Sequence, residues 1–415
     1  GIITHMGYYL KKPILALMHF NLYNRQDFIS QIISCKEWFP PTNYNFIVLK
    51  KNFDKSLQKI LKRIDWYEKK IKIYFLENSF DYNGNDLNSD IIGGSEKTLI
   101  NISNELAKDE NFIIKVFNNT SNTSIINNVS WMNINEIDQS EQVNYVIAMS
   151  DVNLFKNICS KNNFLWSHSI QSFEKFIRKK QLIPFFKFKP VMILEGDYHY
   201  KTRNFLTSLY GKKVLKIAPD NDFINTKIDL NNLPPPNAIF TTKSDRNLNF
   251  LLDAWHQIKK KSIQSKLFIN PPHSLTDINV RDDVILRKKG QKSLLIEDLV
   301  NSRVFITPGH KTEVFCLAAE EARELCIPIV TMGFGSLYER VEHGLTGFVA
   351  KNKKEFIEYT NLILNDNNIY YKLKDNLIKR KNSRNYSHVK SDLIKLLNID
   401  EWFSNISWWQ GKKVR

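Results

Sequence analysis

The sequence predicts an α/β protein with two doubly wound, Rossmann-like domains that face a cleft. Its 415 residues exceed what one hydrophobic core usually serves, so two domains are expected. Strand-like apolar segments alternate with helix-like segments in both halves of the chain. Between the halves lies Pro234-Pro235-Pro236, and three prolines favour an extended, semi-rigid connector. Because ligands of such sheets bind outside the carboxyl ends of the strands, functional residues are expected there.

The first domain is expected over residues 71–233. Residues 71–76 have the apolar pattern of a buried strand. Gly93-Gly94 leads into residues 97–106, whose apolar side chains are close to helical spacing. Further strands are predicted at residues 112–117 and 143–148.

The second domain is expected over residues 237–385 and repeats the alternation. Strands are predicted at residues 238–241, 266–269, 284–286, 304–306 and 329–331. Helices are predicted at residues 248–259, 292–301, 314–324 and 354–364. Two such β/α halves around a proline connector predict two sheets, each covered by helices on both faces.

Composition excludes several classes of protein. Hydrophobic residues at 42% and aromatic residues at 12% are typical of globular chains and exclude a disordered one. No apolar run approaches the roughly 20 residues of a membrane span, and no secretory leader is expected. Residues 1–6 are interpreted as a vector remnant that ends in His5-Met6. The four cysteines are scattered without a CxxC pair, which indicates a reducing cytoplasm rather than a disulfide framework or a structural zinc site.

The net charge of +16 is concentrated at the two ends of the chain. Residues 1–70 hold 12 basic and 5 acidic residues and residues 367–415 hold 11 and 4, so each end carries +7 and the middle only +2. Basic ends indicate an anionic partner surface, either membrane headgroups or nucleic acid. The alternative is charge that only aids solubility. No nucleic-acid motif accompanies the charge, so nucleic acid is not the expected partner.

Residues 304–350 carry the pattern with the most chemistry. A strand-like run ends at Thr307-Pro308-Gly309, and Glu313 and Glu321 follow at the start of a predicted helix and inside it. The backbone N–H groups at such a junction, with the positive end of the helix, suit an anion such as a diphosphate. A spacing of eight residues is a little over two helical turns, which predicts both carboxylates on one helix face. They would accept hydrogen bonds from hydroxyl groups, as on a sugar and a ribose either side of the diphosphate.

The same segment resembles the donor-binding signature of retaining glycosyltransferases of family 4 (group 1), which have the GT-B fold. The residues that carry the resemblance stand in the family's order: Glu313, Glu321-Ala322, Pro328, Gly333, Gly335, Glu339 and Gly344-Leu345-Thr346-Gly347. The resemblance covers about residues 71–385 and is firm over residues 304–350. It implies that Glu313 holds hydroxyls of the transferred sugar and that Glu321 holds the nucleotide ribose. It also implies that backbone N–H groups near Cys316 and Leu317 meet the diphosphate and that Glu339 caps the next helix.

Three further motifs resemble the family more loosely. Lys243 and Arg246 follow the first strand of the second domain, where positive charge would stabilise the leaving diphosphate. Here the order of the two cations is reversed from the family's, and Thr and Asn stand where the family has glycines. Gly93 and Gly94 resemble the glycine loop by which backbone approaches the donor, although Gly-Gly is also common in turns. His168, at the end of an apolar run, matches the family's cleft histidine near the sugar, and a structural histidine is the alternative.

No metal is expected at the site. Asp220-Asn221-Asp222 has the spacing of a DxD metal site, which belongs to a different glycosyltransferase fold, and is interpreted here as a turn. No other acidic or histidine cluster has the spacing of metal ligands. The donor substrate implied by the resemblance is a nucleotide-diphosphate sugar, with no cofactor.

Three segments combine basic and large apolar residues. Residues 54–70 have the pattern of a basic amphipathic helix, and residues 173–189 interleave five phenylalanines with six basic residues. The tail, residues 386–415, is basic and aromatic, with Trp402, Phe403, Trp408 and Trp409 ahead of Lys412, Lys413 and Arg415. Two interpretations stay open for these segments: contact with an anionic membrane, or packing on the protein itself, for the tail on the first domain. Residues 7–70 form a basic N-terminal extension with no assigned role.

The expected function is transfer of a sugar from a nucleotide-diphosphate sugar to a glycan or lipid-linked acceptor, with retention of anomeric configuration. The expected place is the cytoplasm, with peripheral contact to the cytoplasmic face of the membrane, and the expected setting is cell-envelope polysaccharide synthesis. The alternative is a non-catalytic protein that binds nucleotide sugars or glycans on a GT-B fold, because fold alone does not fix function.

Overall fold

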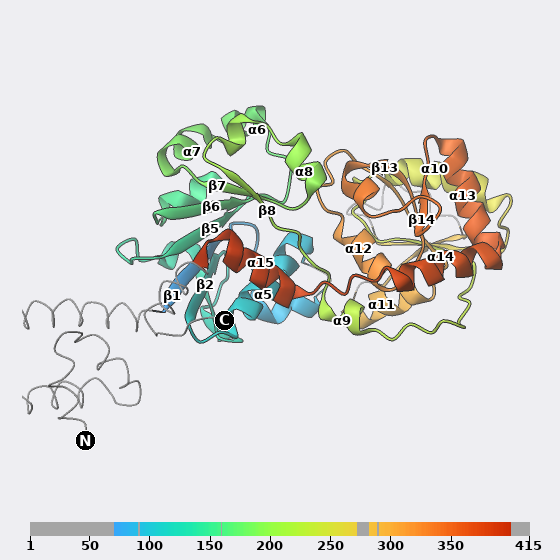
Figure 1. The fold of residues 1–415 in the computed structure, drawn as a ribbon, viewed down its shortest axis with the longest axis horizontal. Helices are drawn as coiled ribbons and strands as arrows, with labels where there is room; N and C mark the ends of the chain where they lie inside the picture. Colours follow the sequence, from blue (N-terminus) through green and yellow to red (C-terminus); the bar gives the residue numbers. More distant parts are fainter. Residues whose placement is uncertain (1–69, 90–91, 159, 272–281, 289, 400–415) are drawn as a thin grey trace, which may run out of the picture. The chain divides into compact units, whose positions relative to one another are not determined.

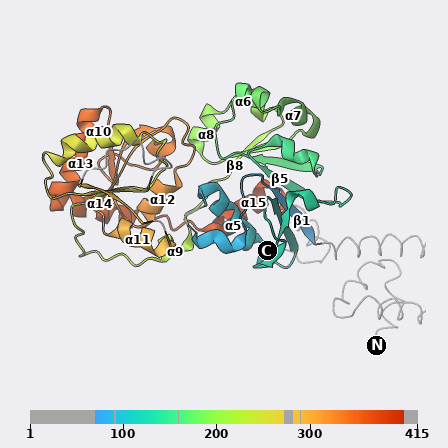
Figure 2. The ribbon, with the colours of Figure 1, turned by 180° about the vertical axis from the view of Figure 1, so that it is seen from behind.

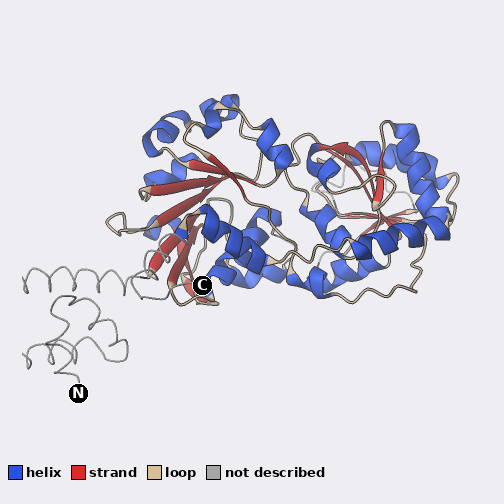
Figure 3. Ribbon diagram, viewed as in Figure 1, coloured by secondary structure: helices blue, strands red, loops and turns tan. Residues whose placement is uncertain are grey.

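Two mainly parallel β-sheets, each with helices on both faces, make up a mixed α/β structure (Figures 1 and 3). The computed structural model describes residues 70–399 apart from 90–91, 159, 272–281 and 289. Ile71–Leu397 group together as one unit. The predicted amphipathic segment 54–70 and the aromatic tail beyond residue 399 therefore lie outside the described residues.

The first sheet has the strand order β3-β4-β2-β1-β5-β6-β7-β8. Its strands are β1 (Ile71–Leu76), β2 (Phe112–Asn118), β3 (Ser124–Ile126), β4 (Val129–Asn133), β5 (Tyr145–Met149), β6 (Asn162–Trp166), β7 (Val191–Leu194) and β8 (Lys212–Val214). Every pairing is parallel except that of β3 with β4, which is antiparallel. Parallel neighbours on both sides of β1 require crossovers in opposite directions, which is the doubly wound arrangement.

Helices connect the strands of this half. The α-helices are α5 (Gly94–Ala107), α6 (Phe173–Arg178), α7 (Leu182–Phe188), α8 (Asp197–Thr202) and α9 (Asn221–Asn225). Single 3₁₀ turns are η1 (Gly84–Asn88), η2 (Ile134–Glu136), η3 (Val152–Lys156) and η4 (Leu206–Ser208). Ser172 starts α6 because its side chain accepts a hydrogen bond from the Lys175 N–H, an N-cap that satisfies one orphan donor.

The second sheet has the order β11-β10-β9-β12-β13-β14, all parallel. Its strands are β9 (Ala238–Phe240), β10 (Leu267–Ile269), β11 (Val284–Leu286), β12 (Val304–Gly309), β13 (Ile329–Phe334) and β14 (Gly347–Val349). Its helices are α10 (Leu248–Lys259), α11 (Lys292–Val300), α12 (Leu317–Glu324), the 3₁₀ turn η6 (Gly335–Glu339), α13 (Lys353–Asn365) and α14 (Asn367–Lys379). Then α15 (Tyr386–Leu396) packs on α5 of the first half, where the Tyr386 hydroxyl lies 3.3 Å from Thr98 Oγ1.

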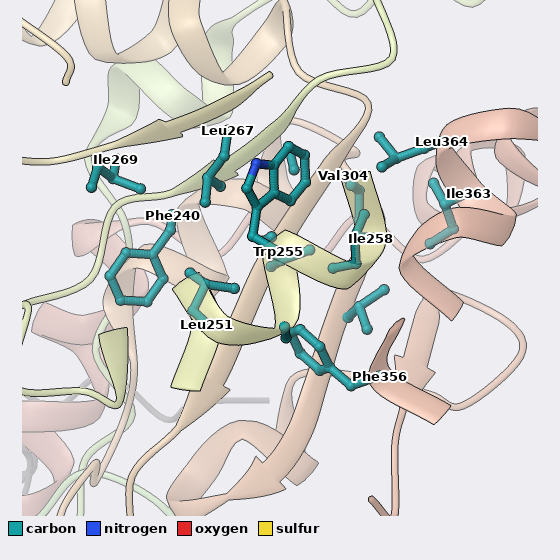
Figure 4. Close-up of a cluster of buried hydrophobic side chains, with 14 of the residues drawn as sticks. Phe240, Leu251, Trp255, Ile258, Leu267, Ile269, Val304, Phe356, Ile363 and Leu364 are labelled. Atoms are coloured by element: carbon teal, nitrogen blue, oxygen red, sulfur yellow. The ribbon is translucent and has the colours of Figure 1, made fainter. Parts of the chain in front are cut away.

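Alternate residues along the strands of the second sheet point into two separate hydrophobic cores, one on each face of the sheet. Phe240 and Val304 face α10, α13 and α14, which lie together in both views of the ribbon (Figures 1 and 2). This core centres on Trp255 of α10, which Figure 4 shows among aliphatic side chains of the sheet and of α13. Ile239 and Phe305, one residue along, face α11 and α12 instead. A strand that is buried on both faces must be apolar throughout, which is why these strands read as continuous apolar runs.

The predicted fold class is confirmed, and most predicted elements lie within a residue or two of those observed. Two helix starts were wrong by three residues, and the first of these is that the helix predicted from residue 97 begins at Gly94. The helix predicted from residue 314 begins at Leu317, because Cys316 adopts a left-handed conformation with φ 59° that no helix can contain. Glu313 precedes the helix, as expected, but the non-helical residues between it and Leu317 remove the helical spacing on which a shared face with Glu321 depended. No helix among the described residues is long and apolar enough to cross a membrane.

Candidate active site

Strand order brings the predicted donor residues together. The second sheet reverses its winding between β9 and β12, which are hydrogen-bonded neighbours. Lys243 and Arg246 follow β9, and Glu313 follows β12. Loops that leave adjacent strands at such a switch point separate and leave room for a ligand between them. Residues 67 positions apart in the sequence thus meet at one edge of one sheet.

Arg246 and Glu313 form an ion pair in which Arg246 Nε donates to Glu313 Oε2 at 3.0 Å. Arg246 also donates to the Thr312 hydroxyl at 3.0 Å. Both side chains of the pair are about one-fifth exposed, so they remain open to a ligand. Asn247, the next residue, caps α10 in a left-handed conformation and donates its amide hydrogen to the Gly309 carbonyl. Three hydrogen bonds therefore tie the β9 loop to β12 and the loop that follows it.

The glycine pair of the motif holds the Glu313 loop in place. Gly335 has φ +68°, and a Cβ there would lie 2.4 Å from the His310 carbonyl oxygen and 2.7 Å from that of Glu313. Only glycine allows this approach. The next residue, Ser336, donates its N–H to the Glu313 carbonyl at 2.9 Å. The function of this glycine is therefore to let η6 clamp the backbone that carries Glu313.

The start of α12 is formed by Phe315 and Cys316. Arg340 donates from Nε to the Phe315 carbonyl at 2.9 Å, and its guanidinium lies 4.0 Å from the centre of the Phe315 ring. Cys316 is buried, and burial together with the nearby Glu313 carboxylate raises the pKa of its thiol well above the ordinary value. The thiol therefore stays protonated, and what Cys316 supplies is a backbone turn that starts the helix.

Gly94, in the first half of the chain, lies beside Leu317, the first residue of α12. A Cβ on Gly94 would lie 3.5 Å from Leu317 Cδ2, so only a small residue leaves the two in simple contact. Gly93 caps α5 and lies beside the Glu96 side chain, 2.8 Å from where a Cβ would stand. Glu321 lies in the second turn of α12 and is buried, 9% exposed. The structure thus groups Gly93, Gly94 and Leu317, with Glu321 one turn along the same helix.

His168 lies two residues beyond the carboxyl end of β6 and is paired with a buried carboxylate. Its Nδ1 is 2.5 Å from Oε1 of Glu195, which follows β7 and is 3% exposed. Burial alone would lower the pKa of His168, but Glu195, with smaller contributions from Glu96 and Glu77, outweighs burial and raises it. The ring also stacks on Trp166, with centroids 5.3 Å apart. Its Nε2 has no hydrogen-bond partner among the described residues.

The pKa of His199, in the first turn of α8, shifts in the opposite direction. Its Nδ1 accepts the backbone N–H of Glu195 at 3.2 Å, and burial lowers its pKa to about 4. Acceptance of that hydrogen bond requires an unprotonated Nδ1, in agreement with a neutral ring. One carboxylate therefore separates a histidine that favours the cation from a histidine that favours the neutral form.

Sequence reasoning missed Glu195, Glu77 and the electrostatic role of Glu96. Glu77 directly follows β1, Glu195 directly follows β7, and Glu96 was quoted only as part of the glycine loop. Burial raises the pKa of Glu77, and the Glu96 carboxylate adds to the increase. The signal that could have found them is position, since acidic residues at the carboxyl ends of parallel strands converge at one edge of the sheet.

The expectations for Glu339 and Asp220 were wrong, and Lys243 does not join the Arg246–Glu313 pair. Glu339 does not cap the next helix: its carboxylate accepts the backbone N–H of Tyr198, in the first turn of α8 in the first half of the chain. Asp220 is not in a simple turn: it caps α9, and with Asp222 it binds Lys292 at 2.7 and 2.9 Å. Lys243 is exposed on its loop and is not brought against Glu313. Among the described residues, no group of three or more His, Cys, Asp or Glu could hold a metal ion.

Comparison with known proteins gives a family match for part of the chain. Residues 241–384 match the model of the family described as glycosyl transferases group 1. No curated protein sequence matches the chain. Similar solved structures include HepE from Anabaena in complex with UDP and glucose, at 14% identity and a TM-score of 0.60, over 79% of this chain and 99% of that one.

Two other structures give the same result. Sucrose-phosphate synthase from Thermosynechococcus elongatus has 13% identity and a TM-score of 0.62, over 81% of this chain and 100% of that one. A glycosyltransferase from Rickettsia africae has 12% identity and a TM-score of 0.57, over 79% and 98%. Likeness at these identities is evidence for the fold. The described chain therefore has the GT-B fold of these glycosyltransferases, and its segment with Arg246, Glu313 and Glu321 matches the group 1 glycosyltransferase family.

Proposed function

We propose that the protein transfers a glycosyl group from a nucleotide-diphosphate sugar to a hydroxyl of a glycan or lipid-linked acceptor, with retention of anomeric configuration. The observation that carries the proposal is the Arg246–Glu313 pair at the switch point of the second sheet, next to the start of α12. In the reaction, the bond from the sugar's anomeric carbon to the diphosphate breaks and a bond to the acceptor oxygen forms. The acceptor proton is released.

Each residue has a defined task in this proposal. Arg246 and the N–H groups at the start of α12 bind the diphosphate and stabilise the negative charge that grows on it as the bond breaks. Glu313 orients the sugar through its hydroxyls, and Glu321 accepts a hydrogen bond from the ribose. Gly93 and Gly94 let the backbone of the first half approach the donor. His168, whose buried Nε2 has no hydrogen-bond partner among the described residues, lies beside the sugar in this proposal.

The finer parts of the proposal rest on the resemblance of the motif. These are retention, the lipid-linked acceptor, a role in cell-envelope polysaccharide synthesis and a place at the cytoplasmic face of the membrane. No metal is assigned, because Arg246 and the helix start together supply the positive charge that the leaving group needs. Transfer is accordingly expected to continue in EDTA.

The test is a thermal-shift panel of UDP-, GDP-, ADP- and dTDP-sugars on the full chain, with UDP-glucose first because HepE was crystallised with UDP and glucose. A donor at 100 times its dissociation constant stabilises by about 2.7 kcal/mol, a shift of several degrees. Glu321→Gln should lose most of that shift. Glu324→Gln is the matched control, because Glu324 is buried on the same helix one turn further on.

Turnover separates an enzyme from a binding protein. Release of nucleoside diphosphate from the stabilising donor, into water or an added acceptor, should fall about 100-fold or more in Arg246→Met. Lys243→Met, on the same loop but exposed, should lose far less. The absence of any donor shift at millimolar concentration contradicts the proposed donor site. A donor shift without release in the wild-type chain would instead indicate a non-catalytic protein that binds nucleotide sugars.

A further inference from the structure

One surface of the first half combines exposed apolar side chains with a high density of positive charge. Residues 172–216, which span α6, α7, α8, η4 and β8, hold 11 Lys and Arg against three Asp and Glu, a net charge of +8. The whole stretch 71–366 carries only +2, so the rest of that stretch is net negative. This region of 45 residues therefore carries +8, while the other residues of 71–366 together carry −6.

The same region is unusually apolar at its surface. Eight of the 17 exposed large hydrophobic side chains in the described part of the chain belong to it. They are Ile177, Ile183, Phe186, Tyr200, Phe205, Leu206, Leu209 and Val214. Ile183 is 81% exposed and Phe205 69%, values at which a large apolar side chain gains nothing from the protein's own core. We call these residues and the basic residues between them the α6–η4 surface.

The exposed residues belong to neighbouring elements. α6, α7 and α8 lie next to one another in both views (Figures 1 and 2). The Phe186 ring of α7 contacts the Tyr210 ring, which follows η4, with centroids 6.5 Å apart. Tyr200 of α8 lies 5.4 Å from the Lys212 ammonium of β8. These contacts link α7 to the residue after η4, and α8 to β8.

The side chains of residues 173–189 divide into a buried set and an exposed set. Phe176 and Phe185 are buried, and their rings pack edge to face, which fixes α6 and α7 on the first sheet. Phe186 and Ile183 point away from that core and are exposed, as are the neighbouring Lys179 and Lys187. Packing on the protein is therefore confirmed for Phe176 and Phe185, whereas the exposed residues of this segment take no part in that core.

We infer that the α6–η4 surface docks on a lipid bilayer that carries anionic headgroups. Positive charge attracts the chain to such a surface, and each Lys or Arg near it strengthens binding about fivefold. Isoleucine, leucine and aromatic side chains then bury at the boundary between headgroups and acyl chains. Long lysine side chains allow both at once, because their ammonium groups reach the headgroups while the apolar side chains insert. A nucleic acid would need rings placed for base stacking, whereas Ile177, Ile183, Leu206 and Leu209 offer none.

The docking surface lies close in the chain to the candidate active site. Only four residues separate His168 from the start of α6, and Lys175 of α6 donates to the Ser169 hydroxyl at 2.8 Å. Glu195 precedes α8 by two residues. If the proposed transfer is correct, a lipid-linked acceptor would therefore reach His168 directly from the bilayer. Docking itself does not depend on that reaction, because it uses none of the donor residues.

Co-sedimentation of the full chain with vesicles tests the inference without any nucleotide sugar. Binding should be strong with phosphatidylcholine vesicles that contain 30% phosphatidylglycerol, weak with phosphatidylcholine alone, and weaker in high salt. The charge variant is Arg178→Glu, Lys179→Glu and Lys187→Glu combined, and we expect it to bind at least tenfold more weakly. Its control reverses three exposed lysines of the second half: Lys260→Glu, Lys261→Glu and Lys266→Glu.

A second pair of variants tests the apolar contribution. The apolar variant is Ile177→Ser, Ile183→Ser and Phe186→Ser combined, and its control is Ile125→Ser, Leu230→Ser and Ile263→Ser, which are as exposed but lie elsewhere. The apolar variant should lose binding at both low and high salt, and the control should not. Because all six residues are exposed, melting temperatures should be unchanged and donor-induced shifts retained.

Two results would overturn the inference. One is equal vesicle binding by wild type, charge variant and apolar variant, which would place membrane contact in another part of the chain. The other is a wild-type dimer that the apolar variant converts to a monomer without any change in vesicle binding, which would assign the surface to a second copy of the chain. Loss of donor binding with normal vesicle binding would count against the proposed function alone.

Discussion

Glu195 contacts two histidines whose pKa values shift in opposite directions. Glu195 accepts from His168, while its backbone N–H binds His199. The raised pKa of His168 means that its charged form is favoured in the fold, and the pKa of about 4 for His199 means that its neutral form is favoured. The direction of each shift has a different cause, a nearby negative charge in the first and burial in the second. The unpartnered Nε2 of His168 is therefore a proton donor over a wider range of pH than that of an isolated histidine.

Glu195→Gln should lower the pKa of His168, because the carboxylate is the group that raises it. A raised folded-state pKa contributes stability that is fully present below the unfolded value near 6.5 and lost as pH rises through the folded value. The difference in melting temperature between wild type and Glu195→Gln should thus be largest near pH 6 and shrink towards pH 9. Comparison over this range stays above most of the interval from pH 6.5 to 4, in which protonation of His199 destabilises both proteins.

The matched control for this prediction is Glu174→Gln, which changes an exposed carboxylate on α6. Its difference from wild type should be small and flat with pH. NMR titration of His168 gives the second measurement, and the resonance should titrate at lower pH in Glu195→Gln. An unchanged His168 titration would show that Glu195 does not control its charge.

At the scale of elements, sequence pattern predicted what depends on apolar periodicity. Five of the six strands of the second sheet were predicted because their residues are mostly apolar and the helices between them carry one apolar face, although β12 and β13 continue three residues further and β14 was missed. The start of α12 was missed because nothing marks Cys316 as left-handed: its conformation is imposed by the loop that Gly335 and Arg340 hold. Local sequence gives no signal for a constraint that comes from residues 20 positions away.

The residues of the candidate site likewise divide into those that a sequence motif predicts and those that only the fold brings together. Glu313, Glu321 and Arg246 could be predicted because they stand in a motif with fixed order, and the structure joins Arg246 to Glu313. Glu195 could not, because it is a single acidic residue whose partner, His168, lies 27 positions away. Such a pair becomes visible only when the order of β6 and β7 is known, since that order places their carboxyl ends side by side.

Lys292 at the start of α11 forms a buried ion pair that should contribute measurably to the free energy of unfolding. It is 5% exposed and is held by Asp220, which is 7% exposed and also accepts from Asn101 of α5. Lys292→Met should destabilise by about 3–5 kcal/mol, because it leaves a buried carboxylate without its cation. Calorimetry should show a lower melting temperature by several degrees.

Lys353→Met provides the contrast. Lys353 pairs with Asp253 across α13 and α10, but the Asp253 side chain is 65% exposed. The cost there should be about 0–1 kcal/mol, because solvent screens the pair. Equal losses in the two variants would mean that Lys292 contributes no more than a surface ion pair.

At the scale of the whole molecule, the two halves are joined by a small number of polar contacts around the site. The first turn of α8 donates the Tyr198 N–H to Glu339 of η6, and the Tyr198 hydroxyl donates to the Lys311 carbonyl at 2.6 Å. Lys311 lies two residues before Glu313. The same α8 carries His199, and η6 carries the clamp on the Glu313 loop. A change in how the halves meet is therefore coupled to the positions of both donor-side and acceptor-side residues.

Glu339→Ala should destabilise the contact between the two halves more than it destabilises the fold of either half. A carboxylate at the first turn of a helix stabilises through charge and through the hydrogen bond it accepts, together about 1–2 kcal/mol. The variant should melt at a temperature lower by roughly 2–6 °C and should show a broader or split calorimetric transition, since each half keeps its own core. Glu342→Ala, which removes a half-exposed partner of Arg380 within the second half, should leave one transition near the wild-type temperature. A sharp, unshifted transition in Glu339→Ala would show that the apolar contacts and the α15–α5 packing join the halves without the Glu339 hydrogen bond. The proposed link between interdomain contact and the Glu313 loop would then be wrong.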